Sequence, residues 1–139
     1  MTTGASVMIV DDDEDIREMG TLVLESQGYQ VAAAKDGLDA LEMLERNGRP
    51  SLILLDLMMP RMDGEQFLKT LRARDQAQIP VVLMSGHSGA SEIARELSAD
   101  ALLCKPVDMD ILLKTVRELI VSRRSPGGGA EPPQKGERW

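Results

Sequence analysis

Cysteine and histidine are almost missing from this chain of 139 residues, and their scarcity excludes two kinds of site. A single cysteine, Cys104, cannot form an internal disulfide, and its apolar neighbours indicate a small buried side chain. One cysteine and one histidine, His87, are also too few for a metal cluster built from these two residue types.

Positive charge and long apolar runs are also in short supply. The chain has 16 Lys and Arg against 23 Asp and Glu, for a net charge of −7. Because a protein that follows a phosphate backbone needs a basic patch, we expect no direct nucleic-acid partner. The N-terminus lacks the features of a signal peptide and no apolar stretch is long enough to cross a bilayer, so we expect a cytoplasmic protein without a membrane partner.

The clearest local signal lies in residues 51–60, where an unbroken apolar run ends on Asp56 and is stopped by Pro60. Such a run is typical of a strand buried on both faces of a parallel sheet. Further strand-like runs occupy residues 7–10, 29–34, 81–84 and 101–104, and helical patterns follow each strand. This alternation predicts an α/β fold, with a parallel sheet covered by helices on both faces.

The length leaves room for one domain. We expect residues 1–5 to be disordered, residues 6–121 to form the domain, and residues 122–139 to form a disordered tail, because the tail is rich in Gly and Pro and has little apolar surface. The first two helices are expected to pack through apolar residues at helical spacing. These residues are Ile16, Met19 and Val23 in the first helix and Leu38, Leu41 and Leu44 in the second.

Polar residues stand at the ends of four of the five predicted strands. They are Asp11 and Asp12 after the first, Asp56 on the third, Ser85 on the fourth and Lys105 after the fifth. In a parallel sheet these ends share one edge, where ligands bind. Three carboxylates gathered there repel one another, so at least one pKa is raised unless a cation shares the site. Mg²⁺ prefers such oxygen ligands, and a lysine and a hydroxyl complete a set of groups that can handle a phosphoryl group.

Five short motifs, in this order and at this spacing, resemble the receiver domain of two-component response regulators. They are Val10-Asp11-Asp12, Asp56-Leu57-Met58-Met59-Pro60, Met62-Asp63-Gly64, Met84-Ser85-Gly86 and Cys104-Lys105-Pro106. The resemblance covers about residues 6–121 and implies a flavodoxin-like, doubly wound sheet with strand order 2-1-3-4-5. It also implies a stand-alone, chemotaxis-regulator-like protein.

The resemblance assigns a role to each residue at the predicted sheet edge. Asp56 would accept a phosphoryl group from a sensor histidine kinase or a histidine phosphotransfer protein. Mg²⁺ would be bound by Asp11, Asp12, Asp56 and the backbone carbonyl of Met58. Ser85 would be the switch hydroxyl, and Lys105 and Gly86 would form the phosphate-binding part of the site. The resemblance also favours a cis Lys105-Pro106 peptide bond.

Three further residues are candidate modulators of this chemistry: the Met58 side chain, His87 and Leu102. Many receivers carry Tyr or Phe three residues before the lysine, where this chain has Leu102. The signal to an unidentified downstream protein must therefore pass without an aromatic rotamer change. We expect it to emerge on the face made by the fourth helix, the fifth strand and the fifth helix.

Two alternative functions are open at this point. A phosphatase of the haloacid dehalogenase type also uses an Asp after a strand with Mg²⁺, but it needs a second Asp two residues later, where this chain has Met58. A pseudo-receiver scaffold usually lacks some acidic or lysine positions, all of which are present here. We therefore expect a protein that catalyses only its own phosphorylation and dephosphorylation.

Overall fold

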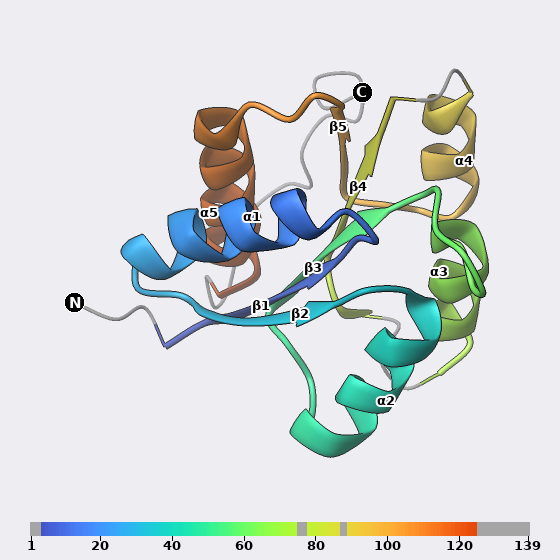
Figure 1. Cartoon of the computed structure of the whole chain (residues 1–139), viewed down its shortest axis with the longest axis horizontal. Coiled ribbons are helices and arrows are strands. Elements are labelled where there is room, and N and C mark those ends of the chain that lie inside the picture. The colour runs from blue at the N-terminus through green and yellow to red at the C-terminus, as the bar shows by residue number, and fades with distance from the viewer. Residues whose placement is uncertain (1–3, 75–77, 87–88, 125–139) are drawn as a thin grey trace.

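The computed structural model describes residues 4–74, 78–86 and 89–124, and these form a five-stranded parallel sheet that alternates with helices (Figure 1). Their order is β1 Ser6–Val10, α1 Glu14–Ser26, β2 Gln30–Ala34, α2 Gly37–Asn47, β3 Leu52–Asp56, α3 Gly64–Arg72, β4 Val81–Ser85, α4 Ala90–Glu96, β5 Ala101–Cys104 and α5 Met109–Arg124. The strands lie in the order β2-β1-β3-β4-β5, so the predicted flavodoxin-like sheet is confirmed.

Helices cover both faces of the sheet (Figure 1). On one face, α1 and α5 pack over the strands, and the side chains of Leu24 and Val116 are fully buried there. On the other face lie α2, α3 and α4, and the second core there includes the fully buried Phe67. Every residue of β3 and β4 is buried, because these strands are covered on both sides.

The register of the strands brings their carboxyl ends together. Asp56, the last residue of β3, pairs with Met84 of β4, and Ser85 pairs with Cys104 of β5. Since all strands run in the same direction, the segments that follow them emerge at one edge of the sheet. That edge is where sequence analysis places the polar residues.

The predicted inner face of α1 is wrong at Met19, whereas Ile16 and Val23 are half-buried. Met19 is 51% exposed, and the buried residues of this helix are Gly20 and Leu24. A Cβ atom at residue 20 would lie 2.9 Å from Cδ1 of Ile9 in β1. The missing side chain therefore lets α1 approach the sheet through Gly20, and this orientation turns Met19 toward the surface.

Two other burial predictions also need correction. Leu38 is 43% exposed, because α2 faces the core through Gly37, Ala40 and Leu44. Cys104 is exposed instead of buried, because it ends β5, the strand at the edge of the sheet. A strand at the edge is covered less completely than a central one, and the apolar sequence around Cys104 does not reveal this position.

The last helix, α5, continues through Arg124, beyond the boundary that the sequence predicts at residue 121. Residues 125–139 lie outside the described residues, so the predicted disorder of that segment is not addressed. Within the described part of the chain, no helix is both long and apolar enough to span a membrane.

Candidate functional site

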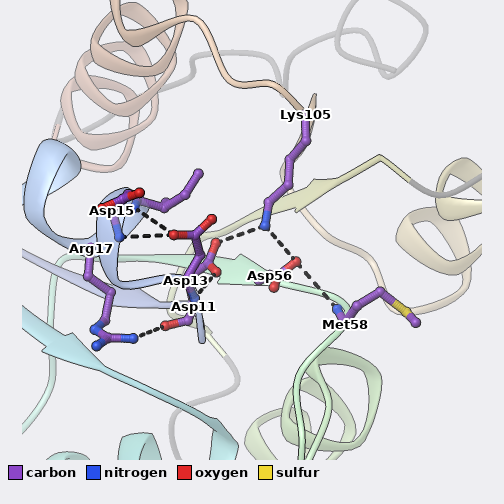
Figure 2. Close-up of polar contacts among 8 residues, drawn as sticks. Asp11, Asp13, Asp15, Arg17, Asp56, Met58 and Lys105 are labelled. Atoms are coloured by element: carbon purple, nitrogen blue, oxygen red, sulfur yellow. Dashed lines mark hydrogen bonds and ion pairs between the residues drawn. The ribbon is translucent and has the colours of Figure 1, made fainter.

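The first part of the site is the segment after β1, where the chain turns into α1. Asp11 is fully buried, whereas Asp12 is exposed. The backbone N–H of Asp13 donates to Asp11 Oδ1 at 2.9 Å, and Arg17 Nη1 donates to the Asp11 backbone carbonyl at 2.9 Å (Figure 2). Asp13 in turn accepts from the backbone N–H of Asp15 and so caps α1. These contacts fix the Asp11 carboxylate toward the end of β3.

Lys105 connects the two buried carboxylates (Figure 2). Its Nζ lies 3.0 Å from Asp11 Oδ2 and 3.2 Å from Asp56 Oδ1. The backbone N–H of Lys105 donates to the Ser85 carbonyl at 3.1 Å, so the end of β5 is attached to the end of β4. The Lys105-Pro106 peptide bond is cis, as the resemblance favours. Strand ends far apart in sequence therefore form one charged cluster.

The charges in this cluster shift two pKa values. Burial, together with repulsion from Asp11, raises the pKa of Asp56 from 3.8 to about 6, although Lys105 and the Met58 N–H act in the opposite direction. Burial would lower the pKa of Lys105, but the carboxylates of Asp11 and Asp56 outweigh it and raise that pKa above 10.5. One acidic pKa is thus raised, as the sequence predicts, but burial contributes more to the shift than repulsion from Asp11 does.

The same cluster has the donor set of a metal site. One carboxylate oxygen each from Asp11, Asp12 and Asp56 lies within 4.8 Å of the others. Asp11 Oδ2 is buried, and among the described residues its one close polar contact is the ion pair with Lys105 Nζ at 3.0 Å. A buried carboxylate oxygen in this condition, among hard oxygen donors, fits Mg²⁺. The acidic triad is typical of the Mg²⁺ site of the family that the motifs resemble.

A cavity of about 620 Å³ gives access to this cluster. Its lining includes Asp12, Asp13, Asp56, Met58, Gly86 and Lys105. The Met58 side chain is 62% exposed, while its backbone N–H faces Asp56 Oδ1 at 3.4 Å (Figure 2). Solvent and small anions can therefore reach the Asp56 carboxylate from this side.

Two other predicted residues, Ser85 and Leu102, are not part of the cavity lining. Ser85 is 3% exposed and ends β4 next to Asp56. Leu102 is half-buried and packs against the core beneath α3 and α4, away from the carboxylates. His87 lies outside the described residues.

Two glycines of the predicted motifs have different packing. A Cβ atom at Gly64 would collide with the backbone carbonyl of Asp56 and lie 2.8 Å from the Cα of Leu57. At Gly86 it would meet Lys105 Cβ at 3.7 Å, which is ordinary van der Waals contact. Packing therefore requires a glycine at residue 64, where α3 starts against the end of β3, but not at residue 86.

This difference predicts the effects of two matched substitutions on stability. Gly64→Ala is expected to lower the free energy of unfolding by roughly 1 to 3 kcal/mol, because its methyl group meets rigid backbone. Gly86→Ala is the control and is expected to stay within about 0.5 kcal/mol of wild type. Urea unfolding followed by circular dichroism measures both values. Equal stability of the two variants would show that the contact between Gly64 and Asp56 is not tight.

Sequence reasoning missed three residues that shape the site. Arg17 was not singled out, although it fixes the Asp11 backbone. The sequence assigns no role at the site to Asp36 or Arg61, yet they form a short ion pair beside it. The available signal was the position of Asp36 two residues after the end of β2, which parallels the position of Asp12 after β1.

Comparisons with known proteins agree with this geometry. A family model described as response regulator receiver domain matches residues 7–117. The chain is 35% identical over 131 residues to the transcriptional regulatory protein CseB of Streptomyces coelicolor, a match that covers 93% of this chain and 55% of that protein. It is 36% identical over 129 residues to the response regulator MprA of a Mycobacterium species, covering 91% of this chain and 55% of that protein. The chain thus spans about half the length of the curated relatives it matches.

Solved structures show the same similarity. The chemotaxis response regulator CheY4 of Vibrio cholerae has a TM-score of 0.77 and 32% identity, with 84% of this chain and 99% of that one covered. The receiver domain of the Francisella response regulator 1452 has a TM-score of 0.80 and 28% identity, with 87% of this chain and 100% of that one covered.

Proposed function

Because the chain belongs to the response regulator receiver domain family, we propose that it accepts a phosphoryl group on Asp56 and uses it to switch a partner-binding face. Receiver domains interact with histidine kinases, so the expected donor is a sensor histidine kinase or a histidine phosphotransfer protein. A domain of this kind serves signal transduction and is generally not a true enzyme. The proposal includes a cytoplasmic location and one folded unit, which covers the predicted residues 6–121 and continues to the end of α5 at Arg124.

The main support for this proposal is the position of Asp56, which lies between the ammonium group of Lys105 and an accessible cavity. Its carboxylate lies 3.2 Å from Lys105 Nζ and lines the cavity of about 620 Å³. Above pH 6 the carboxylate is the main form of Asp56, and this form is the nucleophile. One carboxylate oxygen forms a bond to phosphorus, and the bond from phosphorus to the donor breaks, with its electron pair left on the donor.

Each surrounding group has a part in this transfer. Asp11, Asp12, Asp56 and the Met58 carbonyl would hold Mg²⁺, which when bound supplies positive charge to neutralise phosphoryl oxygens. Lys105 pairs with a phosphoryl oxygen once Asp56 is modified. Gly86 leaves room for the phosphoryl group beside Lys105. The exposed Met58 side chain, at the rim of the cavity, controls the access of water and so the lifetime of the phosphorylated state.

The proposal is tested by incubating the protein with acetyl phosphate, with and without Mg²⁺. Intact-mass spectrometry is expected to show one added phosphoryl group in the presence of Mg²⁺ and a strong reduction with a chelator. A lack of labelling under both conditions would favour the pseudo-receiver scaffold. Steady turnover of p-nitrophenyl phosphate would instead favour a phosphatase, although Met58 occupies the position of the second Asp that such an enzyme needs.

The switch requires a sufficient free-energy difference between two conformations. Moving a population from about 1:99 to 99:1 takes roughly 5.5 kcal/mol. Charge-assisted hydrogen bonds supply roughly 1.5 to 3 kcal/mol each. New contacts from the Ser85 hydroxyl and from Lys105 to the phosphoryl oxygens therefore nearly suffice.

The proposed output face consists of α4, β5 and α5. A cavity of about 520 Å³ lies along β5 and α5, with Leu102 and Ile111 in its lining, and Ile111 is 53% exposed. In α4 the buried residues are the small Ala90 and Ala94, and the one large side chain that packs against the core is the half-buried Ile93. Because few large side chains anchor this helix, it is expected to move at low cost when Ser85 turns toward the phosphoryl group. An unidentified downstream protein would bind this face.

Ser85→Ala is expected to accept a phosphoryl group but to show only a weak conformational change afterwards. In wild type, beryllofluoride, which mimics the phosphoryl group, should change hydrogen exchange in residues 89–97 and at Lys105. In the variant these changes should shrink severalfold, because the hydroxyl that moves the β4–α4 segment is missing. Changes confined to residues 36–47 in wild type would place the output on the opposite side of the domain. Identical changes in hydrogen exchange in both proteins would show that Ser85 is not the switch residue.

A further inference from the structure

The carboxyl end of β2 also carries a buried carboxylate, and it contacts the loop that follows Asp56. Asp36 is 3% exposed. Its Oδ1 accepts from the backbone N–H of Asp39 at 2.9 Å and so caps α2. Its Oδ2 lies 2.7 Å from Nε and 2.6 Å from Nη2 of Arg61. Arg61 belongs to the β3–α3 loop, residues 57–63, which also contains Met58.

Arg61 adopts a backbone conformation that its own residue type disfavours. Its φ is +64°, and the N–H of Met62 donates to the Pro60 carbonyl at 2.7 Å, which closes a three-residue turn around Arg61. Such turns with positive φ at a non-glycine residue are rare and strained. A strained conformation persists only where the surrounding contacts determine it, and the ion pair with Asp36 is such a contact.

The rest of the β3–α3 loop is held at both ends and against α2. The Leu57 N–H donates to the Met84 carbonyl at 3.2 Å, and the Gly64 N–H donates to the Leu57 carbonyl at 3.0 Å. The Gly37 N–H donates to the Met62 carbonyl at 3.2 Å. Between these points, Met58 lines the cavity, and the side chain of Arg61 connects the loop to Asp36.

We propose that the Asp36–Arg61 pair is a positioning device that fixes the β3–α3 loop so that Met58 faces the metal site. The inference rests on the proposed function, because it concerns the Met58 carbonyl as a ligand of Mg²⁺. Arg61 acts through the loop and touches neither Asp56 nor the cluster around Lys105.

The pKa of Asp36 indicates that the ion pair between Asp36 and Arg61 is present at neutral pH. Burial would raise the pKa of Asp36, but the Asp39 N–H and the Arg61 guanidinium outweigh it and hold that pKa below 3.8. The carboxylate is therefore charged at neutral pH, and a buried charge needs its counterion. Among the described residues, Arg61 makes the one ion pair with Asp36. The Arg61 side chain is 54% exposed, so it can be removed without leaving a cavity in the core.

The first test compares Arg61→Gly with Arg61→Ala. Glycine adopts positive φ without strain, so Arg61→Gly removes the guanidinium but not the preference for this turn. In acetyl phosphate labelling, the Mg²⁺ concentration for half-maximal rate is expected to rise roughly tenfold in Arg61→Gly, as for other residues that orient metal ligands. The maximal rate at saturating Mg²⁺ should change far less. Arg61→Ala should show at least the same shift.

The matched control is Arg46→Ala. Arg46 also pairs with a carboxylate, Glu42, but on the exposed side of α2, where both side chains are more than 60% exposed. This variant should keep the wild-type Mg²⁺ midpoint. A second readout needs no metal: amide exchange across residues 57–63 should accelerate in Arg61→Gly and stay unchanged in Arg46→Ala.

A double-variant comparison identifies the partner of Arg61. Asp36→Asn retains an acceptor for the Asp39 N–H and loses the charge, so it should raise the midpoint as well. Arg61→Gly added to Asp36→Asn should then cause little further change. The proposal would be overturned if the shifts in Mg²⁺ midpoint of the two single variants added fully in the double variant. It would also be overturned if Arg61→Gly kept both the wild-type Mg²⁺ midpoint and the wild-type amide exchange of residues 57–63. A wild-type protein that shows no Mg²⁺-dependent labelling would instead overturn the proposed function together with it.

Discussion

Asp56→Asn is expected to abolish labelling by acetyl phosphate and Mg²⁺ while the fold stays intact. The amide lacks the anionic oxygen that attacks phosphorus, and no other carboxylate of the cluster has the same combination of burial, contact with Lys105 and access to the cavity. Asp11 is fully buried, and the cavity lining does not include it. The expected loss exceeds a hundredfold, on the order of the loss of a nucleophile. Intact-mass spectrometry gives the labelled fraction, and circular dichroism checks the fold.

The matched control is Asp110→Asn, which changes an exposed carboxylate in the first turn of α5. It should be labelled like wild type. Comparable labelling of Asp56→Asn and Asp110→Asn would mean that another residue accepts the phosphoryl group.

The second large effect concerns stability in the absence of metal. The pKa of Asp56 is about 6 in the folded protein, against 3.8 for an unperturbed carboxyl group. The folded state therefore binds a proton more tightly than the unfolded state, and ionising Asp56 opposes folding. The penalty is absent below pH 4, grows between about pH 4 and 6, and is complete above that range. By the usual conversion it amounts to about 2 to 3 kcal/mol.

Asp56→Asn removes this penalty and leaves Lys105 paired with Asp11. In chelator at pH 8, the variant is expected to unfold at a higher urea concentration than wild type, with a gap that narrows as the pH falls toward 4. Mg²⁺ should also narrow the gap at pH 8, because a metal bound to the folded wild type stabilises it. The account would be wrong if the variant were less stable at pH 8 or if the gap did not change with pH.

The structure also identifies which carboxylate causes the repulsion. Asp11 raises the pKa of Asp56, whereas Asp12 is exposed and does not contribute to that shift. The sequence places three carboxylates at the sheet edge but cannot reveal their burial. The reason is that burial depends on the turn after β1, in which Asp11 points toward Lys105.

The arrangement of the sheet edge was predictable because it follows from one rule. Parallel strands bring their carboxyl ends together, so residues that end different strands meet whatever their distance in the sequence. Asp56 and Lys105 are 49 residues apart, as their numbers show, and still lie in contact. The order of the short motifs therefore predicts both the strand order and the residues that form the acidic cluster.

Features that depend on how two surfaces approach each other were not predictable in the same way. The exposed position of Met19 results from the close approach of Gly20 to Ile9, which helical spacing alone does not contain. The ion pair of Asp36 and Arg61 joins two loops whose contacting residues are 25 positions apart. No sequence motif contains both residues, so their contact can be recognised only from the three-dimensional arrangement of the two loops.

The central claim is that Asp56 is the phosphoacceptor, and chemical trapping tests it most directly. The wild-type protein is labelled with acetyl phosphate and Mg²⁺, reduced with borohydride, which converts an aspartyl phosphate to homoserine, and digested for peptide mapping. The account predicts homoserine at residue 56 and at no other position. Homoserine at Asp11 or Asp12, or at no residue of a protein that carries a phosphoryl group, would contradict it.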